Sequence, residues 1–180
     1  MGVVAPDFTI LPVSQFNQTL LKTIRSTKKY KKILIIEDDP DMSLVLGRSL
    51  KENYNCLIDI ANDPFEAINF IVEKFYDLII LDWQLPGLNG AETLVEAEKC
   101  LRLEPSIPIQ WDRGQAPVVV FSATEKKYCP PRKTKHFNYI GYISKAQPLN
   151  DIIKIFGAHI GENKKIPAVN PVVNPVLKFS

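Results

Sequence analysis

The chain has 180 residues, of which 46% are hydrophobic and 23% are charged, and its formal net charge at pH 7 is only +2. These values fit a globular protein with a sizeable core, and so small a charge gives no ground for direct binding to nucleic acid. No stretch approaches the ~20 apolar residues that span a bilayer, and the three cysteines lack metal-ligand spacing, so we expect a cytoplasmic protein with reduced thiols and no membrane insertion.

Residues 1–30 are predicted to form an N-terminal extension. Ser14 can cap a short amphipathic helix in it, whose apolar side chains are Phe16, Leu20, Leu21 and Ile24. The basic run at 28–32 follows, and we interpret it as a solvated lead-in to the first strand rather than as a docking patch.

Residues 31–161 are predicted to form one domain in which short strands alternate with helices. The strands are expected at 33–36, 56–60, 78–81, 118–121 and 139–143. The helices are expected to begin at Pro40, at Pro64 and near Ala91, with a last helix over 149–160. Because parallel strands need crossover connections, this order predicts an α/β fold with a doubly wound, five-stranded parallel sheet.

Two of these helices carry a clear start signal. Asp39 and Asp63 each stand directly before a proline, which is the usual combination of a helix cap and a first helical residue. The apolar side chains that we expect to face the core are Met42, Val45, Leu46 and Leu50 in the first helix, Phe65, Ile68, Val72 and Phe75 in the second, and Ile152, Ile153, Ile155 and Phe156 in the last.

Two segments interrupt the alternation. Residues 103–116 contain several helix breakers and are too long for a simple turn. The sequence Cys129-Pro130-Pro131 falls where the fourth crossover helix should begin, and since proline is excluded from helix interiors we expect a short helix that starts at or after Pro131. Residues 162–180 repeat Asn-Pro-Val and are predicted to be an extended, Pro-rich tail.

Carboxylates follow two of the predicted strands. Glu37 and Asp38 come directly after 33–36, and Asp82 comes directly after 78–81. In an open α/β sheet, ligands bind at the carboxyl ends of the strands. Carboxylates gathered there repel one another unless a cation joins them, so this pattern predicts a hard divalent ion such as Mg²⁺ with oxygen ligands.

Two further polar residues are predicted at the same edge. Ser122 ends the fourth strand and Lys145 follows the fifth. A carboxylate can act as a nucleophile toward phosphorus, while a cation, an ammonium and a hydroxyl offset charge on the phosphoryl oxygens. The set is therefore suited to phosphoryl chemistry.

The motifs ILIIEDDPD, DLIILDWQLPGLNG, VVVFSAT and GYISK, in this order, resemble the receiver domain of two-component response regulators, the family of the chemotaxis Y protein with a flavodoxin-like fold. The resemblance implies that Asp82 is the phosphoacceptor. It also implies that Mg²⁺ is bound by Glu37, Asp38, Asp82 and the backbone carbonyl of Gln84. The phosphate-binding and switch residues would be Ser122, Tyr142 and Lys145, and Gln84 and Thr124 would tune the lifetime of the phosphoryl group. The chain departs from the family at Ala146, where a proline usually follows the lysine.

The expected function is that of a stand-alone response regulator, because only about 35 residues follow Lys145 and leave no room for a DNA-binding output domain. It would take its phosphoryl group from a histidine kinase or a phosphotransfer protein and signal through a phosphorylation-dependent protein contact. Beyond self-phosphorylation and slow autodephosphorylation, we expect no enzyme activity. The downstream target is not identified by the sequence, and homodimerisation stays open.

Four alternatives remain at this point. A receiver fold can serve as a constitutive interaction module that phosphorylation does not regulate. A phosphatase of the haloacid-dehalogenase type uses similar groups, but it would need an acid at the position of Gln84. Tyr142 could be a packing residue with no role in switching. The basic residues 132–136 are interpreted as a solvated face, with a remodelled docking surface as the alternative.

Overall fold

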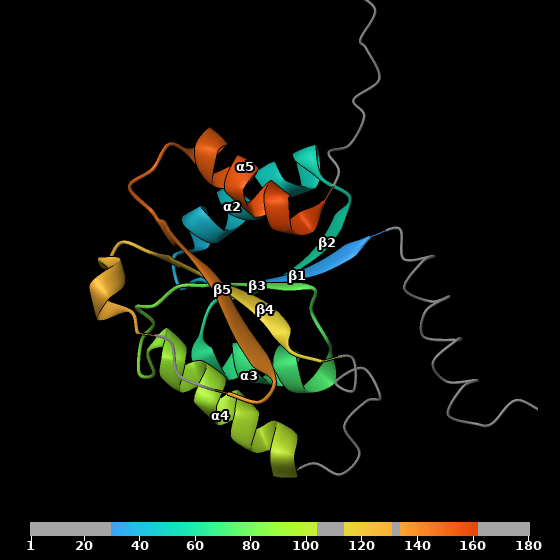
Figure 1. Cartoon of the computed structure of the whole chain (residues 1–180), viewed down its shortest axis with the longest axis vertical. Coiled ribbons are helices and arrows are strands. Elements are labelled where there is room, and N and C mark those ends of the chain that lie inside the picture. The colour runs from blue at the N-terminus through green and yellow to red at the C-terminus, as the bar shows by residue number, and fades with distance from the viewer. Residues whose placement is uncertain (1–29, 104–113, 131–133, 162–180) are drawn as a thin grey trace, which may run out of the picture. The chain divides into compact units, whose positions relative to one another are not determined.

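The computed structural model describes residues 30–103, 114–130 and 134–161 (Figure 1). The elements in chain order are β1 (Lys31–Ile36), α2 (Pro40–Asn53), β2 (Cys56–Ala61), α3 (Pro64–Glu73), β3 (Leu78–Leu81), α4 (Gly90–Leu103), β4 (Ala116–Ser122), the 3-10 turn η2 (Lys126–Tyr128), β5 (Phe137–Ser144) and α5 (Leu149–Ile160). The predicted N-terminal helix, most of the 103–116 segment and the Pro-rich tail lie outside the described residues. Among the helices that are described, none is long and apolar enough to cross a membrane.

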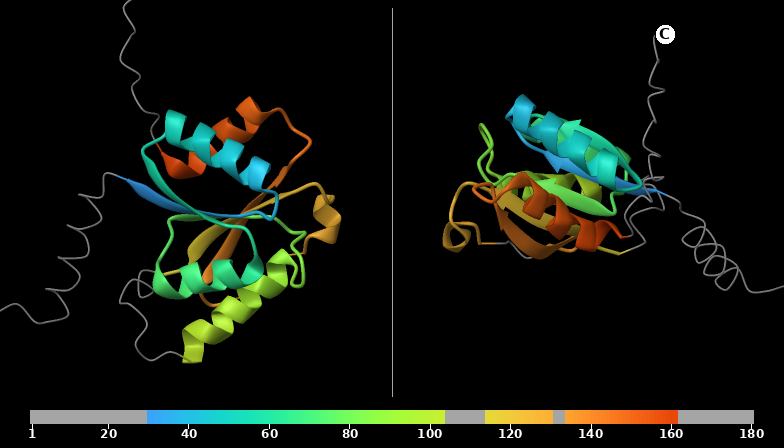
Figure 2. Two further views of the ribbon diagram at one scale, coloured as in Figure 1. Left: turned by 180° about the vertical axis from the view of Figure 1, so that it is seen from behind. Right: turned by 90° about the horizontal axis from the view of Figure 1, so that it is seen from above.

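The five strands form one parallel sheet in the order β2-β1-β3-β4-β5. Helices α2 and α5 cover one face of the sheet, and α3 and α4 cover the other (Figure 1 and Figure 2). The predicted doubly wound fold is therefore confirmed. The chain runs outward from β1 to β2 and returns to β3 on the other side of β1, so the carboxyl ends of β1 and β3 form the switch point at which such sheets bind ligands.

The helix starts follow from the predicted caps. The Asp39 side chain accepts hydrogen bonds from the backbone of Asp41 (2.9 Å) and Met42 (3.2 Å). Asp63 does the same for the first turn of α3, with distances of 2.8 and 2.9 Å. Proline stands at the first position of both helices, where its missing N–H costs nothing. These local signals confirm the two predicted starts.

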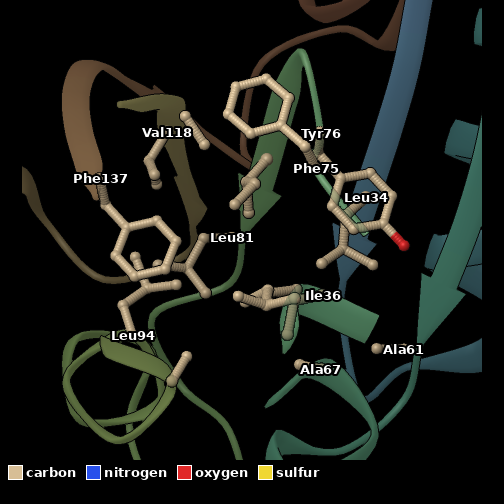
Figure 3. Packing of buried hydrophobic residues seen from close by; sticks show 14 of the residues in the cluster. Leu34, Ile36, Ala61, Ala67, Phe75, Tyr76, Leu81, Leu94, Val118 and Phe137 are labelled. Carbon is tan, nitrogen blue, oxygen red and sulfur yellow. The ribbon is translucent and has the colours of Figure 1, made fainter. Parts of the chain in front are cut away.

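Each face of the sheet has its own buried cluster. Leu34, Ile36 and Leu81 point toward α3 and α4, where they meet Leu94 and Phe137 (Figure 3). The opposite cluster packs under α2 and α5, and its members include Ile33, Ile35, Phe121 and Phe156. Both faces of the central strands are thus covered, which explains why β1 and β3 are continuous apolar runs instead of alternating ones.

Three residues predicted to be buried are exposed: Val45 (46%), Phe65 (70%) and Ile155 (39%). In α3 the buried stripe is Pro64, Ala67 and Ile71, one position before the predicted one. A helix turns by about 100° per residue, so an offset of one position carries a side chain off the buried face. The rest of the predicted faces is buried or partly buried against the core.

The connection between β4 and β5 differs from the prediction. Its helical turn, η2, precedes the prolines, and the described residues 134–136 are not helical. The prediction of a helix after Pro131 is therefore wrong for the part of this connection that the structure describes. Since β5 already begins at Phe137, little chain remains after the prolines to form one.

Strand β5 carries a β-bulge. Ile140 is skipped in the pairing between β4 and β5. Beyond the bulge Tyr142 pairs with Val120, and Ile143 pairs with Phe121. Successive side chains of a strand point to opposite faces, so the single extra residue places Tyr142 on the face that Val120 occupies.

Candidate functional site

The acidic residues meet at the switch point between β1 and β3. The backbone N–H of Glu37 donates to Ala61 (3.0 Å) and that of Asp82 donates to Ile36 (2.8 Å), so both residues extend the strand pairing. Glu37 is 1% exposed and Asp82 is 4% exposed, whereas Asp38 faces solvent. One carboxylate oxygen from each of the three lies within 4.8 Å of the others. The predicted acidic cluster is thus brought together by the fold.

Lys145 is the basic partner of these acids. Its Nζ donates to Glu37 Oε1 and to Asp82 Oδ2, each at 2.7 Å. Its backbone N–H donates to the carbonyl of Ser122 at 3.0 Å, which fixes the start of the loop after β5. The ammonium also lies 5.5 Å from the centre of the Phe121 ring. Lys145 thereby joins the ends of β1, β3, β4 and β5.

The electrostatics of the cluster favour an additional positive charge. Burial raises the pKa of Glu37 to about 7; the hydrogen bond from Lys145 opposes this shift and the charge of Asp82 adds to it. For Lys145, burial acts to lower the pKa, but the hydrogen bonds to Asp82 and Glu37 outweigh burial and raise it. One ammonium thus contacts two of the three carboxyl groups that lie together here.

The residues present fit a hard divalent cation. Glu37 Oε2 is buried and accepts no hydrogen bond. All three acids offer carboxylate oxygen, the ligand that Mg²⁺ prefers, and the exposed Asp38 leaves the cluster open on one side.

The loop after Asp82 packs tightly against α4. The backbone N–H of Gln84 donates to Asp82 Oδ1 at 3.1 Å, while the Gln84 side chain is exposed. The N–H of Gly90, the first residue of α4, donates to the carbonyl of Trp83 at 2.9 Å. A β-carbon on Gly90 would collide with the backbone oxygen of Asp82, so this glycine allows α4 to begin directly beside the acid.

The predicted switch residues Ser122 and Tyr142 lie near the ends of β4 and β5, and the loop after β4 connects them through Thr124. Ser122 is fully buried, and its hydroxyl accepts the N–H of Thr124 at 3.2 Å. The Tyr142 hydroxyl donates to the carbonyl of Thr124 and lies 3.4 Å from that of Ser122. The same Thr124 carbonyl accepts from the thiol of Cys129 at 3.8 Å.

Two residues of this site were missed in the sequence. Gly90 ends the motif that contains Asp82, so a breaker at that place was the available signal. Cys129 was interpreted only as a reduced thiol, and no spacing in the sequence connects it to Thr124.

Residues 33–156, well over half of the chain, match the family described as response regulator receiver domain. Among curated proteins, a 72-residue part is 38% identical to the autoinducer 2 sensor kinase/phosphatase LuxQ of Vibrio parahaemolyticus, which covers 40% of this chain and 8% of that protein. Response regulator ArlR of Staphylococcus aureus is 28% identical over 154 residues, which cover 77% of this chain and 64% of that protein. The chain thus spans less than two thirds of the length of these relatives.

Two solved structures illustrate the structural likeness. The response regulator protein TrrA of Thermotoga maritima, in complex with Mg(2+)-BeF, has a TM-score of 0.53 at 23% identity and matches 72% of this chain and 99% of that one. The receiver domain of a sensor histidine kinase from Pseudomonas aeruginosa, with a magnesium ion coordinated in its active-site cleft, has a TM-score of 0.50 at 19% identity, covering 73% and 98%. At these identities the likeness shows the fold alone.

Proposed function

The chain belongs to the family of response regulator receiver domains of two-component systems, and we propose that it accepts a phosphoryl group on Asp82 from a histidine kinase or a phosphotransfer protein. Receiver domains are in general signalling modules rather than enzymes, and they interact with such donors. The output of this chain is proposed to be a phosphorylation-dependent contact with another protein.

The observation that carries this proposal is the position of the Lys145 ammonium, 2.7 Å from both Asp82 and Glu37. In the proposed step a carboxylate oxygen of Asp82 attacks the phosphorus of a phosphohistidine. The new O–P bond forms as the N–P bond breaks, and the donor imidazole leaves with the bonding electron pair. Lys145 then exchanges a carboxylate contact for the new phosphoryl oxygens and offsets their charge.

Glu37, Asp38, Asp82 and the backbone carbonyl of Gln84 are proposed to hold Mg²⁺. The unpartnered, buried Glu37 Oε2 and the excess of carboxylates over ammonium groups support this assignment. When bound, the ion supplies positive charge beside the transferred group. Asp38, the exposed member, is the residue through which the ion would enter.

Ser122 and Tyr142 are proposed to be the switch residues, whose arrangement changes when Asp82 carries a phosphoryl group. The Ser122 hydroxyl accepts the N–H of Thr124 and keeps its own proton for a phosphoryl oxygen. The hydroxyl of the half-buried Tyr142 donates to the carbonyl of Thr124, beside the end of β4. Phosphorylation would bias a pre-existing equilibrium toward this hydrogen-bonded arrangement of Tyr142.

Gln84 and Thr124 are proposed to tune how long the phosphoryl group lasts. The Gln84 side chain is exposed beside Asp82, and Thr124 is half-buried next to Ser122. Neither side chain carries an acid or base, so neither can activate water strongly. We therefore expect the phosphoryl group on Asp82 to persist and to be hydrolysed only slowly.

A constitutive interaction module is the second candidate. In the described part of the connection between β4 and β5, the helical element is the short 3-10 turn η2, and this departure from the regular alternation favours the module. The two functions differ in whether Asp82 changes chemically.

The test is to incubate the protein with a small phosphodonor and Mg²⁺ and to measure its mass. We expect a gain of one phosphoryl group in the wild type and in Asp151→Asn, a control at an exposed aspartate of α5, and no gain in Asp82→Asn. An unmodified wild type, or equal gain in Asp82→Asn, would refute the phosphoacceptor assignment and leave the constitutive module.

A further inference from the structure

The backbone of Thr124 is held from both sides. Its N–H donates to the Ser122 hydroxyl at 3.2 Å. Its carbonyl accepts from two side chains, the Tyr142 hydroxyl and the Cys129 thiol, the latter at 3.8 Å. Thr124 therefore connects the proposed switch hydroxyl with the proposed switch aromatic, and Cys129 shares its contact with Tyr142.

Cys129 is positioned to donate a hydrogen bond from its thiol to the Thr124 carbonyl and to stay protonated while it does so. Its backbone N–H donates to the carbonyl of Lys126 at 3.0 Å and closes the turn η2, and the residue is only 4% exposed. Burial, together with the charge of Asp82, raises the pKa of the thiol, so the sulfur keeps its proton at neutral pH. A thiol in this state donates a weak hydrogen bond.

A pocket beside Tyr142 leaves room for a different position of its ring. Cys129 and Tyr142 line a pocket of about 210 Å³, whose walls include Val120 and Gly141. An aromatic ring that loses its bond to Thr124 can move into such a space without displacing packed side chains. Without its contact to the Thr124 carbonyl, the ring therefore has room to adopt a second arrangement.

We propose that Cys129 is a positioning residue of the switch: with Tyr142 it holds the Thr124 carbonyl and stabilises the loop arrangement in which Tyr142 lies against the end of β4. This inference rests on the proposed function, because the arrangement matters only if Asp82 is phosphorylated. Linkage is reciprocal, so a residue that stabilises the arrangement favoured by a phosphoryl group also raises the affinity for a phosphoryl analogue.

The first test measures binding of beryllofluoride in the presence of Mg²⁺, followed by the fluorescence of Trp83 in a Trp111→Phe background. Cys129→Ala should weaken the affinity about two- to fivefold, because one weak hydrogen bond is lost. Cys129→Ser keeps a hydroxyl donor and should recover part of the loss. Cys56 is a buried cysteine of β2 and belongs to the core cluster under α2 and α5, so Cys56→Ala should leave the affinity unchanged.

The second test follows the reactivity of the native Cys129 thiol and compares it with that of Cys56. A protein with Cys56→Ala and Cys100→Ala reports maleimide labelling of Cys129, and one with Cys100→Ala and Cys129→Ala reports labelling of Cys56. Saturating beryllofluoride and Mg²⁺ should slow the labelling of Cys129 more than that of Cys56. Equal slowing of both would indicate global stabilisation only and would overturn the inference.

The outcomes separate the two proposals. If beryllofluoride binds the wild type and Cys129→Ala equally, and Cys129→Ala merely unfolds at a lower temperature, Cys129 only packs and the further inference fails alone. If the wild type binds no beryllofluoride, the proposed function fails and the inference falls with it.

Discussion

At the scale of single residues, the chemistry of the site depends on the small number of cationic side chains beside its carboxylates. The ammonium of Lys145 is the basic group that contacts Glu37 and Asp82 among the described residues, and both acids are almost fully buried. A buried carboxylate that loses its partner is costly, and a phosphoryl group brings further negative charge. The chemistry should thus be sensitive to this side chain.

Lys145→Met keeps the apolar stem of the side chain and removes the charge. We expect the rate of phosphorylation by a small phosphodonor to fall about a hundredfold, since one preorganised charge contact to the reacting group is lost. The rate is measured by intact mass over time. Lys154→Met, at an exposed lysine of α5, is the control, and a similar loss there would contradict the assigned role of Lys145.

Gly90→Ala should disturb the acid through the backbone. The new β-carbon would meet the backbone oxygen of Asp82 and the side chain of Leu81. We expect a loss of stability of about 1–3 kcal/mol from overpacking, measured by urea unfolding, together with slower phosphorylation.

Gly47→Ala in α2 is the matched control for this change. Its β-carbon would make ordinary contacts with Ile60 and Ile35 at 3.5 and 3.6 Å. Alanine is the better helix former, so this variant should be as stable as the wild type or more stable. Equal destabilisation by both changes would mean that the crowding at Asp82 is not the cause.

At the scale of elements, a buried carboxylate joins α4 to the start of β5. Glu98 is 5% exposed and accepts the backbone N–H groups of Lys135 (3.2 Å) and His136 (3.0 Å). Arg102 donates to the same carboxylate from two nitrogens, at 3.1 and 3.0 Å. This contact holds β5, whose other end carries Tyr142, on the helix that begins beside Asp82.

Glu98 also predicts a pH dependence of stability. Burial acts to raise its pKa, but the hydrogen bonds from His136 and Arg102 outweigh burial and lower it. A folded-state pKa below the unfolded value gives stability that is present above about pH 4.3, the unfolded value, and lost as the pH falls through the folded value.

Glu98→Gln should therefore cost about 1–3 kcal/mol at pH 7, because buried donors lose a charged acceptor. The difference from the wild type should shrink below about pH 4. Urea unfolding at several pH values measures both. Glu96→Gln, on the exposed side of α4, should change little, and a constant difference at all pH values would contradict the argument.

At the scale of the whole molecule, the site is assembled by the parallel sheet. Strand ends from β1, β3, β4 and β5 supply its groups, so the site exists only when the sheet is folded. A cation that binds the assembled acids should therefore stabilise the entire domain.

Mg²⁺ is expected to raise the thermal unfolding midpoint, with about 2.7 kcal/mol of added stability at a hundred times its Kd. Asp38→Asn should remove most of this gain and should be at least as stable as the wild type without Mg²⁺, since one repelling charge is gone. Asp41→Asn, an exposed aspartate in the first turn of α2, should keep the Mg²⁺ response. If the two variants respond alike, Asp38 is not a ligand.

The sequence by itself determined the order along the chain of the five strands and of the helices outside the connection between β4 and β5, the two capped helix starts and the set of polar residues at the strand ends. These depend on local periodicity, on Asp-Pro pairs and on the rule that parallel strands place their carboxyl ends at one edge. The proposed acceptor Asp82 and its partner Lys145 could be named in this way.

Only the tertiary structure decided how these groups meet. Val45, Phe65 and Ile155 are exposed because of which side of each helix packs against the sheet. The apolar pattern in the sequence locates that side only to within one residue. The face that Tyr142 takes depends on a β-bulge beside Gly141; a glycine inside a strand is compatible with a bulge, but the pairing with β4 decides where the register shifts. The contact of Cys129 with Thr124 arises because a short turn folds back on β4, and such long-range geometry is set by packing and not by the composition of the segment.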